Sequence, residues 1–150
     1  MEAKYGHKIK LMRHKYNQCN ATIMAMTGLD MEANKKRRMA EYVFFRCMIA
    51  GYLVSEGVDY SVIGLYMGKE RTAVYYYLQI HKRNMKADTA RAKFYRSFFG
   101  DFMLCVNGTK TGTSYSSDLV RSKIVSVRTK QQRKADERQH ALSKRLQPGV

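Results

Sequence analysis

The fold is decided by residues 59–83, which read DYSVIGLYMGKERTAVYYYLQIHKR. Apolar residues recur at three- and four-residue intervals on both sides of Gly68. This spacing predicts a short helix over residues 59–67 and a second helix that begins near residue 70. Asp59 is of a residue type that caps helix starts, and glycine is common just past a helix end. The segment is therefore predicted to be a helix-turn-helix, although plain packing of two helices would give the same pattern.

The predicted second helix opens with side chains that suit contact with nucleic acid. Thr72 and Ala73 are small enough to let the first turn approach base edges. Lys69 and Arg71 can bind phosphate, and Arg71 can alternatively donate two hydrogen bonds to guanine. Backbone N–H groups at the helix start add attraction for anions. Together with Glu70, these residues form the candidate recognition turn.

The net charge also indicates a polyanionic partner. The chain has 150 residues, with 28 Lys and Arg against 12 Asp and Glu, which gives a formal charge of +16. Such an excess favours nucleic acid first and an anionic membrane second. The hydrophobic fraction of 45% is typical of a globular protein, so the chain is not simply a disordered basic tail.

Two further sets of side chains are candidates for nucleic-acid contact. The first is a basic run made of Lys35, Lys36, Arg37 and Arg38. Such a run is usually a solvated surface, but beside a helix-turn-helix we expect it to contact phosphates. The second set is Tyr75 and Tyr76, which lie off the expected core face of their helix. Each of them either touches sugar-phosphate and thymine methyls or packs on the surface.

The remaining pattern predicts an all-α, compact helical fold, because proline is nearly absent and β-type alternation is rare. An apolar stripe over residues 5–26 predicts one helix or two pieces, and another helix is expected over residues 39–56. The stripe of this second helix comprises Met39, Tyr42, Val43, Ile49, Ala50 and Leu53. Arg46 interrupts it, which indicates a specific acceptor for its head group; one candidate is an internal ion pair with Glu41 or Glu56.

The C-terminal half is predicted to end in a basic arm. Asp88 can cap another helix, whose aromatic residues between 94 and 103 either cover the helix-turn-helix or form a groove for a protein. Residues 107–117 read as a linker, and residues 118–146 as a marginal basic helix that orders on a partner. We therefore expect an N-terminal helical extension (1–17), a helix-turn-helix domain with a supporting helix (18–106), and a basic linker and marginal helix (107–150).

The cysteines and the hydropathy favour a cytoplasmic protein without a membrane partner. Cys19, Cys47 and Cys105 are odd in number and far apart, so we expect reduced thiols in or near the core. No apolar run approaches the roughly 18 residues that a membrane span needs. The first residues also lack the apolar region of a secretory signal.

We expect neither an enzyme nor a cofactor, metal or small-molecule substrate. No residue lies in a recognisable nucleophile motif. Residues 64–70 come close to a phosphate-binding P-loop, but they have one spacer too few, and Glu70 stands where Ser or Thr binds magnesium. The spacing of His7, His14 and Cys19 matches no zinc motif.

Residues 63–74, IGLYMGKERTAV, resemble the signature of the C-terminal DNA-binding domain (domain IV) of DnaA, the bacterial replication initiator. That family shows an Ile-Gly pair, a phenylalanine, a glycine and then Arg-Asp-His-Thr/Ser-Thr-Val. Upstream, residues 27–30 match its Thr-Gly pair, residues 35–38 its basic loop, and residues 46–53 its Arg-Gln-hydrophobic-Ala helix. The resemblance covers residues 18–85.

The resemblance implies which residues meet double-stranded DNA. Residues 69–73 would enter the major groove, residues 35–38 would reach phosphates and the minor groove, and Arg46 would help to hold the backbone. The implied role is replication initiation or control, or transcription regulation, without ATPase activity. The chain is similar to stand-alone copies of this domain in phages and mobile elements, which implies a place at the nucleoid of a bacterial host.

This sequence departs from the family at the base-reading positions. The segment is one residue shorter, Arg71 replaces the histidine, Ala73 replaces the second threonine, and Tyr76 matches a later histidine of the family. We therefore expect a DNA site other than the initiator's usual box. Phe44-Phe45 also replaces smaller residues, which is expected to change local packing.

Two other function classes fit the same residues. One is a non-specific nucleic-acid-compacting or RNA-binding protein, for which the charge is generic and no sequence preference is expected. The other is an interaction protein whose N-terminal helix and aromatic stripe dock on a replication or virion component. Only the protein complex is expected to survive high salt, where phosphate binding fails.

Overall fold

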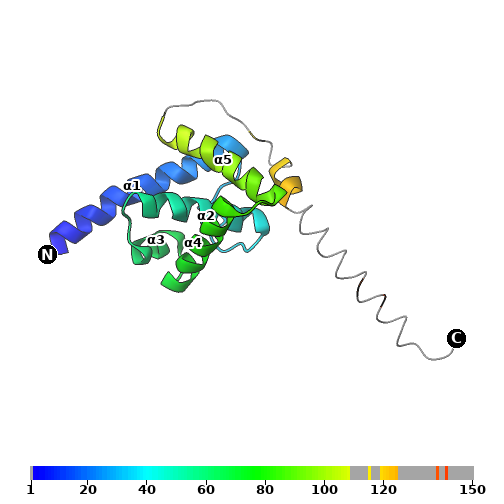
Figure 1. The fold of residues 1–150 in the computed structure, drawn as a ribbon. Coiled ribbons are helices and arrows are strands. Elements are labelled where there is room, and N and C mark those ends of the chain that lie inside the picture. The colour runs from blue at the N-terminus through cyan, green and yellow to red at the C-terminus, as the bar shows by residue number, and fades with distance from the viewer. Residues whose placement is uncertain (1, 109–114, 116–118, 125–137, 139–140, 142–150) are drawn as a thin grey trace.

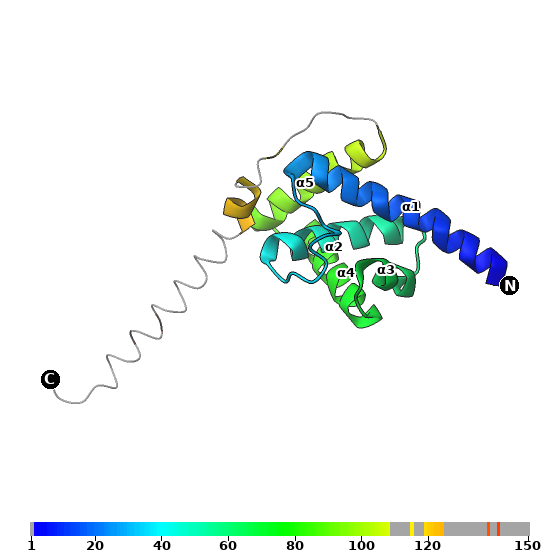
Figure 2. The same cartoon turned by 180° about the vertical axis from the view of Figure 1, so that it is seen from behind.

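The chain folds into a compact all-helical body (Figures 1 and 2). The computed structural model describes residues 2–108, 115, 119–124, 138 and 141, with side chains from Ile9 onward except that of Leu11. Its helices are α1 (Glu2–Thr27), α2 (Ala40–Ser55), α3 (Tyr60–Met67), α4 (Arg71–Lys86) and α5 (Ala90–Val106), and residues 119–124 are also helical. The all-α fold expected from the sequence is confirmed.

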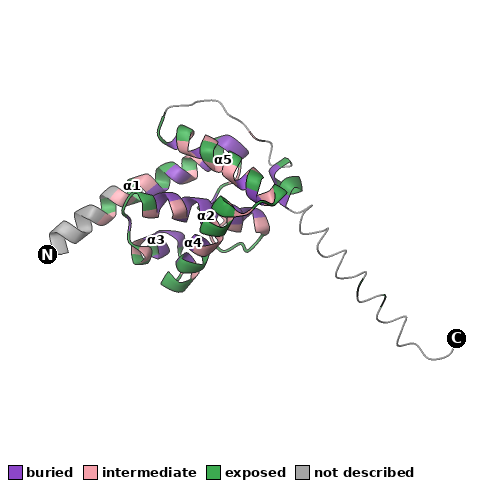
Figure 3. Ribbon diagram, viewed as in Figure 1, coloured by how far each residue is buried: buried purple, intermediate pink, exposed green. Residues whose placement is uncertain are grey.

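The second helix, α2, lies at the centre and is buried on every side rather than along one stripe (Figure 3). Phe44, Phe45 and Cys47 are buried beside the expected apolar positions, whereas Met39 is exposed. The expected single stripe is therefore wrong. The physical reason is that α1, α3, α4 and α5 all pack against this helix, so all of its faces must be apolar or satisfied internally.

The first helix, α1, is one continuous element, so the expected division after residue 17 falls inside it. Its stripe is buried at Tyr16, Cys19, Ile23 and Met26. The N-terminal end projects beyond the rest of the helical body (Figure 1). Gly28 ends the helix at a φ of 80°, as expected for a helix C-terminus. Residues 31–36 that follow it are turns.

The α3–α4 pair follows the predicted spacing closely. The Asp59 carboxylate accepts from the Tyr60 N–H, and Gly68 ends α3 in the left-handed region at φ 66° and ψ 36°. The Lys69 N–H then donates to the Gly64 carbonyl at 2.8 Å, which closes the turn before α4 begins. On α4, Val74, Tyr77 and Leu78 recur at three- and one-residue intervals on one face and are buried, and His81 on the same face is half-buried.

The last long helix, α5, covers the body with aromatic side chains. Tyr95, Phe98 and Phe102 are buried, and Phe98 packs against Phe45 with ring centroids 5.1 Å apart. The expected cap was Asp88, but the hydroxyl of Thr89 accepts from the Ala92 N–H at 3.1 Å instead. Asp88 is one residue too early for that bond, and its carboxylate pairs with Lys93. The aromatic stripe is thus core.

A C-terminal segment returns to the core after α5. The N–H of Tyr115 donates to the Met26 carbonyl, and Val120 and Ile124 are fully buried. Arg121 pairs with Glu41, which is only 3% exposed, with Nη2 and Oε1 at 3.3 Å. The expected marginal helix is therefore helical and packed over residues 119–124, and most of the rest of that prediction lies outside the described residues.

All three cysteines are free, as expected, and Cys19 and Cys47 are buried. Burial raises the pKa of the Cys47 thiol to about 12, which keeps it protonated and unreactive. No helix among the described residues is long and apolar enough to cross a membrane. Within the same residues, no group of three His, Cys, Asp or Glu side chains is placed to hold a metal ion.

The α3–α4 turn predicts a specific glycine requirement. A Cβ at Gly64 would lie 2.6 Å from the Lys69 carbonyl oxygen, a backbone atom that cannot move without opening the turn. We expect Gly64→Ala to lower the free energy of unfolding by about 1–3 kcal/mol. Gly100→Ala, where no atom lies within 4 Å, is the matched control and should stabilise the helix by about 0.5–1 kcal/mol. Urea denaturation distinguishes them, and equal effects would contradict the close approach.

His81 predicts a loss of stability in mild acid. Its Nδ1 lies 2.5 Å from the Tyr95 hydroxyl, and burial lowers its pKa below 6.5. The folded state thus favours the neutral ring, so its contribution is full above pH 6.5 and is lost as the pH falls below that value. Thermal melts at pH 7.5 and 5.5 should show a smaller acid loss for His81→Gln than for the wild type. The exposed His14→Gln is the control, and an unchanged acid loss in His81→Gln would refute the assignment.

Candidate nucleic-acid interface

The basic loop, residues 28–39, is held to α2 by a buried arginine. Arg46 is 4% exposed, and its Nη2 donates to the Asn34 carbonyl at 3.0 Å and to the Lys35 carbonyl at 2.8 Å. Within the loop, the Asp30 carboxylate accepts from the Ala33 N–H and the Arg37 N–H donates to the Asn34 carbonyl. The loop backbone is therefore fixed from inside the core.

The internal ion pair that the sequence left open for Arg46 is not formed. In the described part of the chain, Glu41 pairs with Arg121 and Glu56 pairs with Lys15 at 3.1 Å. The acceptors of Arg46 are backbone carbonyls, so its positive charge has no carboxylate bonded to it among the described residues.

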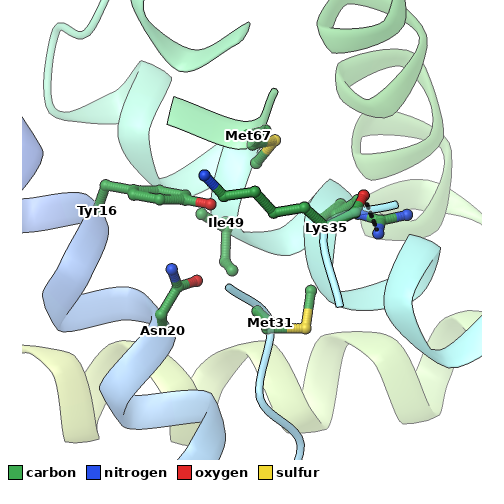
Figure 4. Close-up of a pocket in the computed structure, with 7 residues that line it drawn as sticks. Tyr16, Asn20, Met31, Lys35, Ile49 and Met67 are labelled. Atoms are coloured by element: carbon green, nitrogen blue, oxygen red, sulfur yellow. Dashed lines mark hydrogen bonds between the residues drawn. The ribbon is translucent and has the colours of Figure 1, made fainter. Parts of the chain in front are cut away.

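The four residues of the basic run do not share one orientation. Lys36, Arg37 and Arg38 are exposed, whereas Lys35 is half-buried. The Lys35 ammonium lies 2.6 Å from Glu32 Oε1, and its side chain lines a pocket between α1, α2 and α3 (Figure 4). Three of the four predicted contacts thus reach solvent.

The start of α4 has no side-chain cap. Glu70 occupies the cap position without a side-chain hydrogen bond, and no acidic residue lies in the first turn. Arg71 and Thr72 are exposed, and Ala73 is half-buried. The first backbone N–H groups of a helix have no intrahelical acceptor, and the helix dipole makes this end positive.

Cations from three elements meet beside this helix start. The pKa of Lys69 is lowered by partial burial and then by the nearby positive charges of Arg46 and Arg38. Arg46 and Arg38 also act on Tyr77, whose pKa is raised by burial and moderated by these two guanidinium groups. The basic loop, α2 and the α3–α4 turn therefore bring Lys69 near Arg38 and Arg46, from which the sequence separates it by more than twenty residues.

Two tyrosines extend the same helix toward solvent. Tyr75 is 56% exposed and Tyr76 is 60% exposed, although Tyr77 beside them is buried. Exposed tyrosine rings offer an apolar face and a hydroxyl, both of which suit sugar-phosphate or base-methyl contacts.

Sequence reasoning missed three residues that organise this surface. Tyr77 lies against the Arg46 guanidinium, Glu32 binds Lys35, and Asn34 supplies a carbonyl to Arg46. The only signal in the sequence was the three-residue spacing of Glu32 and Lys35. This spacing predicts an ion pair only where the backbone is helical or forms a turn.

No protein-family model, curated protein or solved structure matches the chain.

The anchoring of the loop by Arg46 predicts a large effect of its removal. Arg46→Met keeps much of the side-chain volume but leaves two carbonyl acceptors without their charged donor. We expect the free energy of unfolding to fall by about 1.5–3 kcal/mol. The exposed Arg83→Met is the control with the same charge change and should cost far less. Urea midpoints that match for both variants would contradict the anchoring.

Proposed function

We propose that this protein binds double-stranded DNA through a helix-turn-helix formed by α3 and α4, with the basic loop as a second contact. The observation that carries the proposal is that the basic loop, with Lys36, Arg37 and Arg38 exposed, lies beside Lys69 and the uncapped start of α4, so that the charge of Arg38 acts on Lys69. Bringing like charges together costs free energy, which a polyanion bound at this place would offset.

Two kinds of contact follow from the exposure of the residues. Lys36, Arg37, Arg38 and Lys69 supply phosphate contacts, which provide most of the affinity and make it depend on salt. Arg71 and Thr72 stand at the exposed first turn of α4, the part of a recognition helix that reads base edges. Tyr75 and Tyr76 extend that contact along the helix.

The resemblance to the DnaA DNA-binding domain supports a duplex partner and a role in replication or its control, or in transcription. The turn order, the Ile-Gly pair and the basic loop carry this resemblance, whereas the base-reading residues differ. We therefore expect this protein to bind a DNA sequence that differs from the initiator's usual box. Buried Arg46 takes a positioning role in this proposal, because its guanidinium bonds the loop backbone rather than reaching solvent.

Selection of bound sequences from a random duplex library tests the function, with RNA as competitor at physiological salt. We expect an enriched motif for the wild type. Arg71→Ala should lose about 1–3 kcal/mol on that motif and accept a wider range of bases at one position. Neutralising Lys36 or Arg37 should weaken all sequences alike.

Other outcomes would support the remaining classes. Tight binding without enrichment, and with equal affinity for RNA, would reduce the function to non-specific nucleic-acid binding. Absence of duplex binding at low salt, together with a salt-resistant complex with a protein, would replace the proposal by a docking role.

A further inference from the structure

We infer that Lys35 is a positioning residue that locks the basic loop against the core, rather than one of the phosphate contacts in the run. We call the contacts of Lys35 with Glu32 and Arg46 the lock. Its effect on DNA binding rests on the proposed function, but the contacts themselves exist in the free protein. The basic run then has one inward side chain, Lys35, and three outward ones.

The side chain of Lys35 makes contacts through both its ammonium group and its aliphatic stem. Its ammonium lies 2.6 Å from Glu32 Oε1, and its Cδ lies 3.9 Å from the position that a Cβ would take on Gly68. The stem thus packs along the turn that leads into α4. A phosphate contact would require the ammonium to leave Glu32 and swing outward, which would remove this packing.

The lock also reaches α1. The hydroxyl of Tyr16 donates to Glu32 Oε2 at 3.4 Å, so the carboxylate joins the loop and the first helix. Figure 4 shows the Lys35 stem crossing the pocket, with its ammonium directed toward Tyr16 and with Met67 of α3 on one side. The space left between these side chains is small, with a volume of about 10 Å³.

The backbone of the same residue completes the attachment. The Lys35 carbonyl accepts from Arg46 at 2.8 Å, so the main chain is bound to α2, whereas the side chain pairs with Glu32 of the same loop. Lys36, Arg37 and Arg38 follow directly and are exposed. Fixing Lys35 therefore orients these three residues beside the start of α4, where Arg38 already acts on Lys69.

Substitution of the acidic partner Glu32 distinguishes a positioning role of Lys35 from a direct phosphate contact. Glu32→Gln removes a negative charge near the DNA surface, so charge alone would strengthen duplex binding. The lock predicts the reverse: Glu32→Gln and Lys35→Met should each weaken binding roughly 5- to 30-fold. The double variant should be no weaker than Lys35→Met, because both substitutions break one interaction.

The salt dependence supplies a second readout, with Lys36→Met as the matched control. Loss of a phosphate contact makes the slope of log K against log salt less steep by about 0.9. We expect this change for Lys36→Met and an unchanged slope for Lys35→Met. A reduced slope in Lys35→Met, or tighter binding in Glu32→Gln, would overturn the lock.

Hydrogen exchange without DNA separates this inference from the proposed function. The Arg37 N–H, bonded to the Asn34 carbonyl at 3.0 Å, should exchange faster in Lys35→Met and Glu32→Gln and unchanged in Lys36→Met. If the Arg37 N–H exchanges faster in both variants but the wild type binds no duplex, the lock is supported and the proposed function is rejected. Unchanged exchange, together with normal DNA binding by the wild type, would reject the lock and retain the function.

Discussion

The arrangement of this protein depends on the burial of α2 on all of its sides. A helix with no solvent-facing stripe can exist only where other elements cover every face, and α1, α3, α4 and α5 do so here. The single strongly polar side chain in its middle, Arg46, therefore has to be satisfied from within. The backbone of the basic loop supplies the acceptors, so the core itself fixes the position of that loop.

This constraint links packing to the candidate interface. Arg46 holds the loop on one side and lies against Tyr77 of α4 on the other. The close turn at Gly64 and Gly68 sets where α4 begins, beside the same loop. A cationic surface made of short loop and helix-start segments is thus attached to the core that supports it. A backbone held in place in this way meets a lower ordering cost on binding than a flexible basic segment.

Local sequence signals predicted the helix order well. Asp59 and Gly68 set helix ends through local backbone chemistry, so the sequence alone located them. The spacing of Val74, Tyr77 and Leu78 likewise defined the inner face of α4. The displaced cap at Thr89 shows the ordinary uncertainty of one residue at a helix start.

Long-range features could not be predicted in the same way. The all-round burial of Phe44 and Phe45, the return of Val120 and Ile124 to the core, and the pairing of Glu41 with Arg121 each join residues that the sequence separates widely. Periodicity reports a face of one helix, but it does not report which neighbours cover the other faces. For the candidate site, the residue types were visible in the sequence, whereas the inward turn of Lys35 and the acceptors of Arg46 required the tertiary structure.

The most direct test of the account is an NMR titration of the protein with a short duplex, followed through its backbone amide shifts. The account predicts that the largest changes lie in residues 36–38 and 69–76, where the exposed basic loop meets the start of α4. It also predicts little change along α5. Changes concentrated in α1 and α5, with none at the loop or at the start of α4, would contradict the central claim that this cationic surface is the DNA-binding site.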